Sequence, residues 1–193
     1  MNALLEQRMN KAEFLRWVQA REGRYELSDG RVMQQMTGGT VRHFDLADNI
    51  AFILKSRIDG ERWGVTVGGP GVAIPERVAG VSTRYPDVVV RALGAPLEAL
   101  EIDNPVVLVE VLSPSSVTLD LVIKSREYRS IPSLDAYIVA SQDEPRLTVW
   151  RRMAKGAFPE LPLELCDPKD EVRLEVLGCV VTIAEIYRRV LPV

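Results

Sequence analysis

Two acidic residues lie within apolar stretches of this chain, where a charge is costly unless it has a partner. Asp87 follows Pro86 and precedes three valines, and Glu110 lies near the end of the apolar run 106–111. Burying an unpaired carboxylate costs several kcal/mol, so each acid must meet solvent, a basic side chain or a metal ion. Neighbouring strands lie about 4.8 Å apart, so carboxylates on adjacent strands could bind one hard cation such as Mg²⁺.

Asp120, Lys124 and Tyr128 recur every four positions, so on a helix they form one stripe. This helix would follow directly after the strand of Glu110, and its early turns can face the end of that strand, where sites on open α/β sheets lie. Lys124 could then give a fixed positive charge to a phosphate oxygen or orient a water molecule. The alternative is an ordinary solvated face, on which Asp120 favours the helix N-terminus and pairs with Lys124.

Two further residues are weaker candidates for chemistry. His43 is the only histidine and lies in the first turn of a predicted helix, where a structural hydrogen bond is the simpler interpretation. Glu26 lies in a predicted hairpin, and glutamates in such strands are commonly solvated. The sequence has no G-x-S-x-G elbow, P-loop, G-x-G-x-x-G fingerprint or zinc-spaced Cys/His set, which disfavours a hydrolase triad and a zinc site.

Helical spacing and capping residues predict four helices that frame these candidates. The first begins after Asn10 and ends near Gly23, the second covers 41–58 after Thr40, the third covers 118–130, and the last begins after Thr182. The apolar face of the second helix is expected to carry Phe44, Ala47, Ile50, Ile53, Leu54 and Ile58.

Turn signals and runs of β-branched residues predict the strands. They cover 63–67, 85–91, 105–112, 135–141 and 146–152, with one hairpin turning at Asp29-Gly30 and a closing hairpin over 171–182 around Gly178. Residues 158–168 are expected to form a Pro-rich loop. The order of helices and strands indicates an α/β or α+β domain around a mixed sheet.

Composition bounds the class of protein. The 193 residues favour a single domain over 1–193, and 47% hydrophobic with 26% charged residues is ordinary globular usage. Two cysteines, Cys166 and Cys179, are too few for a disulfide scaffold. No apolar run is long enough to span a membrane, and the charged N-terminal stretch does not resemble a secretory signal, so we expect a cytoplasmic protein. The net charge of −3 argues against a strong global attraction to phosphate but leaves room for a local basic groove.

Five short motifs occur in order along the chain. They are Tyr25-Glu26-Leu27-x-x-Gly30, His43, Pro86-Asp87-Val88-Val89-Val90, Val109-Glu110-Val111-Leu112-Ser113-Pro114-Ser115, and Asp120-x-x-x-Lys124-x-x-x-Tyr128. Together they resemble the Uma2 family, also called DUF820, of bacterial restriction-endonuclease-like proteins. The resemblance extends from about Lys11 to Tyr187.

The resemblance implies membership of the PD-(D/E)xK nuclease superfamily. It implies a central mixed β-sheet flanked by helices, with an N-terminal helix and hairpin and a C-terminal hairpin and helix. Pro86-Asp87 would be the PD element and Glu110 the second acid, and a backbone carbonyl at Val111 would join them as a metal ligand. Leu112 stands where the superfamily usually has lysine, and Lys124 on the next helix would take its place. Asp120, His43, Glu26 and Tyr128 are the remaining expected site residues.

The function expected from these residues and the resemblance is an endonuclease that hydrolyses phosphodiester bonds with Mg²⁺ or Mn²⁺. The predicted partner is nucleic acid, with DNA preferred to RNA, and a homodimer would suit cleavage of both strands of a duplex. Four arginines near the motifs are expected to assist Lys124 in attracting phosphate: Arg84, Arg91, Arg126 and Arg129. The alternatives are a non-catalytic DNA-binding or assembly module on the same fold and a hydrolase of some other phosphate ester.

Overall fold

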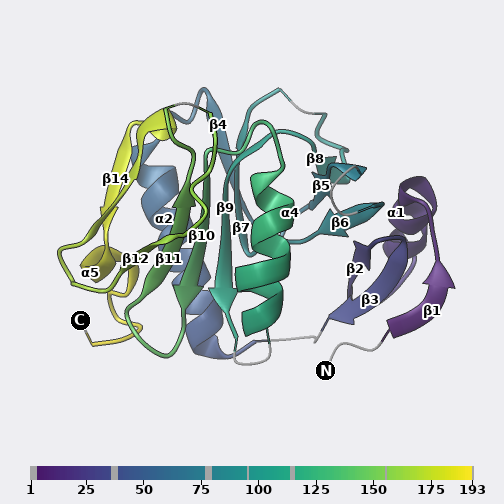
Figure 1. Cartoon of the computed structure of the whole chain (residues 1–193), viewed down its shortest axis with the longest axis horizontal. Helices are drawn as coiled ribbons and strands as arrows, with labels where there is room; N and C mark the ends of the chain where they lie inside the picture. The colour runs from purple at the N-terminus through teal and green to yellow at the C-terminus, as the bar shows by residue number, and fades with distance from the viewer. Residues whose placement is uncertain are drawn as a thin grey trace.

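The structure is a computed structural model that describes residues 4–35, 39–76, 80–94, 96–113, 116–154 and 156–192. A central mixed sheet has helices on both faces, and a second sheet with the N-terminal helix lies beside it (Figure 1). This confirms the expected α+β architecture. The motif residues Pro114 and Ser115 lie outside the described residues.

The central sheet has six strands in the order β12-β11-β10-β9-β7-β4. Their bounds are β4 Trp63–Val67, β7 Val88–Ala92, β9 Pro105–Leu112, β10 Ala136–Ser141, β11 Leu147–Arg151 and β12 Leu163–Leu165. Strands β9 and β10 are parallel, and the other neighbours are antiparallel. Strand β12 corrects the prediction of a loop over 158–168, because its three residues pair with β11 on the edge of the sheet.

The register of β7 and β9 brings the two strand acids together. Val88 pairs with Val109, so extending the antiparallel register by one residue sets Asp87 opposite Glu110. Asp87 itself precedes β7, whose predicted start at residue 85 was too early. Pro86 has no backbone N–H to give to a sheet ladder, which explains the later start.

Alternation along β9 decides which face of the sheet Glu110 joins. Val107, Val109 and Val111 belong to a core shared with helix α2 (Val41–Arg57), while Leu108 belongs to the opposite core with Tyr128. Glu110 shares the parity of Leu108 and therefore faces the helix that follows β9. Figure 1 shows α2 behind the sheet and the helix that follows β9 in front of it.

Helix α2 begins as predicted, with Thr40 accepting a hydrogen bond from the backbone N–H of His43. Its buried face contains Leu46, Ala47, Ile50, Ala51 and Leu54. The prediction that Phe44 belongs to this face is wrong, because the first turn of α2 borders a pocket and Phe44 remains 44% exposed.

The predicted helix over 118–130 is present but changes type. A π-helix (Leu119–Lys124), labelled η1, runs into helix α4 (Ser125–Arg129). Such π-helical turns are rare and often occur at functional sites. Here Asp120 and Lys124 are both buried against the sheet, so the solvated-face alternative for the stripe is wrong.

The second sheet has the strand order β1-β3-β2-β6-β5-β8. The bounds of its strands are β1 Leu4–Arg8, β2 Arg24–Ser28, β3 Arg31–Gln35, β5 Gly71–Ile74, β6 Ser82–Arg84 and β8 Glu101–Ile102. The predicted hairpin is confirmed, with Asp29 and Gly30 both at positive φ (49° and 73°), as a type I′ turn requires. Helix α1 (Lys11–Gln19) carries the predicted capping box between Asn10 and Glu13.

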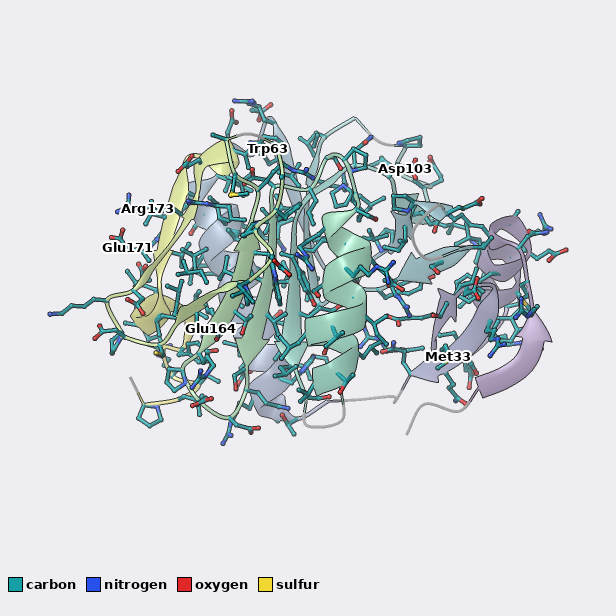
Figure 2. The ribbon with its side chains drawn as sticks, in the orientation of Figure 1. Met33, Trp63, Asp103, Glu164, Glu171 and Arg173 are labelled. Carbon is teal, nitrogen blue, oxygen red and sulfur yellow. The ribbon has the colours of Figure 1, made fainter. Side chains whose placement is uncertain are left out.

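A C-terminal hairpin and a short helix close the fold. The elements are β13 Glu171–Leu174, the 3₁₀ turn η2 Glu175–Leu177, β14 Cys179–Thr182 and α5 Ile183–Ile186. Glu171 and Arg173 point outward (Figure 2), whereas Val172 and Leu174 between and after them are buried. Both cysteines are free thiols. Among the described residues, no helix is long and apolar enough to cross a lipid bilayer.

Candidate active site

A pocket of about 440 Å³ opens where β9, the start of α2, η1 and the N-terminal hairpin meet. Six of the predicted site residues line it: His43, Asp87, Glu110, Val111, Asp120 and Lys124. The other two, Glu26 and Tyr128, lie fully buried behind the pocket wall and contact its lining residues. The structure therefore brings all eight predicted residues into one region.

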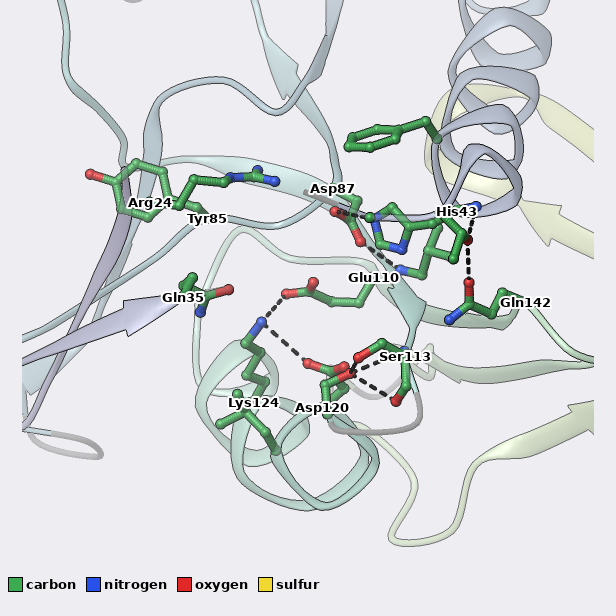
Figure 3. Close-up of a pocket in the computed structure, with 16 residues that line it drawn as sticks. Arg24, Gln35, His43, Tyr85, Asp87, Glu110, Ser113, Asp120, Lys124 and Gln142 are labelled. Atoms are coloured by element: carbon green, nitrogen blue, oxygen red, sulfur yellow. Dashed lines mark hydrogen bonds and ion pairs between the residues drawn. The ribbon is translucent and has the colours of Figure 1, made fainter. Parts of the chain in front are cut away.

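Lys124 lies at the centre of three carboxylates. Its Nζ donates a hydrogen bond of 2.8 Å to Oε1 of Glu110 and lies 3.2 Å from Oδ1 of Asp120 (Figure 3). It also lies 3.5 Å from Oε1 of Glu26. Burial disfavours the charged amine, which is only 3% exposed, but the three acids outweigh that effect and hold the pKa of Lys124 well above its usual value. Lys124 is therefore a fixed cation.

Glu110 is held from one side only. Within the described residues, its Oε1 accepts both the Lys124 bond and a 2.8 Å hydrogen bond from the hydroxyl of Tyr128, and no bond reaches Oε2. Burial raises the pKa of Glu110 well above its usual value, and the neighbouring acids Asp120 and Asp87 add to this effect. A further positive charge beside Glu110 would stabilise the ionised form of its carboxyl group.

Asp87 is held by two donors of different kinds. Its Oδ2 accepts a 2.7 Å bond from the backbone N–H of Val111, and its Oδ1 lies 3.2 Å from Nε2 of His43. Burial alone would raise the pKa of Asp87, but the bond from His43 and the bond from Val111 outweigh it and lower the pKa. The N–H and C=O of a residue in an extended strand face the same neighbour, so the carbonyl of Val111 also faces the Asp87 side.

A second layer of charges lies behind Lys124. Arg84, 2% exposed, donates two 2.7 Å bonds to the carboxylate of Glu127, and its Nη1 donates a 3.1 Å bond to Oε2 of Glu26. Burial raises the pKa of Glu26, but Lys124 and Arg84 outweigh burial and lower it. The alternative that Glu26 is an ordinary solvated strand residue is therefore wrong.

The pocket lining contains none of the four arginines that were expected to attract phosphate, which are Arg84, Arg91, Arg126 and Arg129. The Arg84 guanidinium is already bound in its buried ion pairs with Glu127 and Glu26. Arg91 lies four residues along β7 from Asp87, about 13 Å away. Arg126 is exposed on α4 away from the pocket, and Arg129 donates to the carbonyls of Ser125 and Pro159. Closeness of these arginines to the motifs in the sequence therefore did not predict closeness to the pocket in the fold.

The balance of charge at the site is negative. Its five carboxylates belong to Glu26, Asp87, Glu110, Asp120 and Glu127. They share two fixed cations, Lys124 and Arg84, and one histidine. In addition, Oδ1 of Asp120 is buried and accepts no hydrogen bond from the part of the chain that the structure describes, although the Lys124 amine lies close to it. Buried oxygen donors with unmet charge suit a hard cation such as Mg²⁺.

Side chains alone do not form a metal cage. Among the described residues, no group of three or more His, Cys, Asp or Glu side chains is placed to hold a metal ion. A cation here would have two carboxylates, those of Asp87 and Glu110, a backbone carbonyl and water as ligands. Mg²⁺ commonly binds through one or two carboxylates and keeps several waters, so the donor set fits that ion.

Several pocket residues were missed by sequence reasoning. Arg24 and Gln35 are paired across the open end of the β2–β3 hairpin, and Phe44 lines the pocket from α2. Gln142 follows β10 and accepts a 2.9 Å hydrogen bond from the hydroxyl of Thr40, which fixes the start of α2. No local pattern marks these residues, because the pocket forms from segments far apart in the sequence.

The fold and site define a mixed α+β protein with an acidic pocket at one end of its central sheet and a buried lysine in that pocket. The sequence model of the Uma2 family, described as "Putative restriction endonuclease", matches residues 12–184, so the chain belongs to the Uma2 family. The resemblance seen in the motifs is thereby confirmed.

Two relatives extend this result. An uncharacterized protein, slr1290, from Synechocystis sp. is 24% identical over 182 residues, which cover 94% of this chain and 92% of that protein. A crystal structure described as a putative nuclease belonging to DUF820, from Anabaena variabilis, aligns with a TM-score of 0.74 at 15% identity. The alignment covers 95% of this chain and 99% of the Anabaena chain, and at this identity it shows that the fold is shared.

Proposed function

We propose that this protein is a nuclease that hydrolyses phosphodiester bonds of nucleic acid with Mg²⁺ or Mn²⁺. The observation that carries the proposal is the meeting of Asp87 and Glu110 from adjacent strands with the Lys124 amine from the next helix, all lining one pocket. Membership of a family described as restriction endonucleases supports the same activity.

Asp87, Glu110 and the carbonyl of Val111 are the proposed metal ligands. When bound, the metal would lower the pKa of a coordinated water and offset charge on the scissile phosphate. His43 and the Val111 N–H keep Asp87 ionised and oriented for this role. The Tyr128 hydroxyl holds Oε1 of Glu110, which leaves Oε2 for the cation.

Lys124 is the proposed catalytic cation. Its amine is already charged and fixed by Glu110 and Asp120, so no reorganisation is needed when negative charge develops on the phosphate. Asp120 and Glu26 are proposed as positioning residues that keep the amine at the pocket floor. Leu112 occupies the usual lysine position and packs with the apolar core instead.

Cleavage of labelled oligonucleotides by the purified protein tests the proposal. We expect Mg²⁺-dependent cleavage that EDTA stops and that Asp87→Asn and Lys124→Met each reduce by at least about a hundredfold. Asp48→Asn and Lys55→Met change exposed residues of α2 away from the pocket and serve as matched controls. Cleavage that survives in both site variants would refute the assignment.

A non-catalytic nucleic-acid-binding or assembly module is the second candidate. Two observations favour it: Lys124 already pairs with the acids, and side chains alone do not form a metal cage among the described residues. This candidate predicts nucleic-acid binding that is equal with and without Mg²⁺ and no cleavage under any condition.

The remaining expectations are also proposals. A homodimer would show as twice the chain mass of 21.6 kDa in light scattering. The cytoplasmic location and the preference for DNA over RNA stay predictions, and parallel cleavage assays on the two nucleic acids check the preference.

A further inference from the structure

We propose that the pocket receives one unpaired nucleotide of a single-stranded segment, with Phe44 stacking on its base and Arg24 binding a phosphate beside the scissile one. This inference rests on the proposed function, because it names the substrate form that the same pocket would take. Phe44 and Arg24 both line the pocket, and neither takes part in the proposed hydrolysis.

Arg24 is a cation without an assigned partner at the pocket wall. It is exposed, and within the described part of the chain its guanidinium makes no hydrogen bond or ion pair. Figure 3 shows the Arg24 side chain pointing across the pocket toward Asp87. Its cross-strand partner is Gln35, whose buried Nε2 also makes no hydrogen bond. The open end of the hairpin thus presents the unused guanidinium of Arg24 to the pocket, where it suits phosphate oxygens.

Phe44 supplies an aromatic surface directly beside the acids. Its ring meets that of His43 edge-on, with centroids 5.4 Å apart and an interplanar angle of 82°, and His43 in turn contacts Asp87. Phe44 contributes nothing to the buried face of α2 and lines the pocket instead. An exposed aromatic ring next to a backbone-binding groove is the usual platform for an unpaired base.

The position of Phe44 favours a single-stranded substrate over a duplex. In a duplex, the faces of each base are covered by its neighbours in the stack, so a side chain can stack on a base only after the base leaves the helix. Glu110 and Asp120 at the pocket floor are almost fully buried, and about 440 Å³ is small for a site that would enclose more than one or two nucleotides. An unpaired strand can enter this space and place a phosphate near Lys124 without unstacking.

Binding is measured separately from cleavage, so that failure of this inference and failure of the nuclease proposal give different results. The probes are a fluorescent oligodeoxythymidine, the matching oligouridine and a blunt DNA duplex of the same length, followed by anisotropy in Ca²⁺ and by cleavage in Mg²⁺. The variants are Phe44→Ala, Phe44→Trp and Arg24→Ala. The controls are Phe52→Ala on the same helix and Arg31→Ala on the same hairpin, both exposed and outside the pocket lining.

We expect the single strands to bind at least about tenfold more tightly than the duplex. Phe44→Ala should weaken single-strand binding by about tenfold, and Phe44→Trp should retain it. Arg24→Ala should reduce the slope of log affinity against log salt by about 0.7, the value for one phosphate contact on a single strand. Both control variants should behave as the unchanged protein does.

Equal or tighter binding of the duplex would overturn the inference, and so would Phe44→Ala and Arg24→Ala variants that bind single strands normally. Single-strand preference that depends on Phe44 but is accompanied by no cleavage would support the pocket assignment while refuting the nuclease proposal. Oligothymidine and oligouridine bound alike would show that the pocket reads an unpaired strand regardless of its sugar.

Discussion

Arg84 and Glu127 form a buried bidentate ion pair that ties the two halves of the candidate site together. Arg84 lies three residues before Asp87, and Glu127 lies three residues after Lys124. The pair therefore fixes the β6–β7 segment against α4, and with it the placement of the acid relative to the amine.

The first prediction concerns the stability that this pair confers. Arg84→Met leaves Glu127 and Glu26 without their cation, and we expect a loss of about 3–5 kcal/mol in the free energy of unfolding in urea. Arg84→Lys keeps the charge but not the forked geometry, so it should lose less. Arg126→Met, at an exposed position of helix α4 next to Glu127, should change the free energy of unfolding by less than about 0.5 kcal/mol. A loss below about 1 kcal/mol for Arg84→Met would contradict the assigned role.

The second prediction compares two buried tyrosines. The Tyr128 hydroxyl donates to the Glu110 carboxylate, and the Tyr137 hydroxyl donates to the backbone carbonyl of Asp120. Hydrogen bonds to charged groups contribute about 1.5–3 kcal/mol and neutral ones about 0.5–1.5 kcal/mol. Tyr128→Phe should therefore lower the free energy of unfolding more than Tyr137→Phe. Equal losses in chemical denaturation would contradict the stronger bond assigned to Tyr128.

Much of the secondary structure could be predicted because its signals are local. The capping boxes at Asn10 and Thr182 and the Asp29-Gly30 turn are confirmed, since each depends on hydrogen bonds or φ angles within a few residues. The short strands β1, β5, β6 and β8 were missed. Each has five residues or fewer and pairs with partners that the local sequence does not specify.

The site could be predicted where strand pairing or helical spacing determined it. Valine runs placed Glu110 on a buried strand and Asp87 directly before the neighbouring strand, and the register of the two strands sets the acids opposite each other. The exposure of Phe44 was predicted wrongly, the burial of Arg84 was not predicted, and the solvated alternative for Glu26 is wrong. These placements depend on how the N-terminal hairpin and the start of α2 pack against the central sheet, and residue spacing carries no information about that packing.

The third prediction concerns the pH dependence of metal binding. The bond from His43 helps to hold the pKa of Asp87 below its usual value, so His43→Ala should raise that pKa. Because a carboxylate must lose its proton to bind a metal, the variant should lose Mn²⁺ affinity at a higher pH than the unchanged protein does as the solution is acidified through the binding range. Titrations of both proteins and of Asp48→Asn across this range check the shift. Parallel pH profiles would contradict it.

The fourth prediction concerns stability in acid. The bond from Arg57, together with the Thr182 cap, lowers the pKa of Glu185 to about 2. A folded-state pKa below the unfolded one stabilises the fold above about pH 4.5, and this contribution disappears as the pH falls toward 2. Glu185→Gln should therefore be slightly less stable than the unchanged protein at pH 7, by up to about 1 kcal/mol because the pair is well exposed, and equally stable near pH 2. A difference in thermal unfolding that grows on acidification would contradict this sign.

Mn²⁺ titration by calorimetry measures whether Asp87 and Glu110 form one cation site beside the fixed amine of Lys124. We expect millimolar or tighter binding to the unchanged protein, loss of that binding in Asp87→Asn and Glu110→Gln, and retention in Asp48→Asn. If Glu110→Gln binds Mn²⁺ as well as the unchanged protein does, or if neither binds it, the site does not hold the cation and the hydrolytic mechanism is wrong.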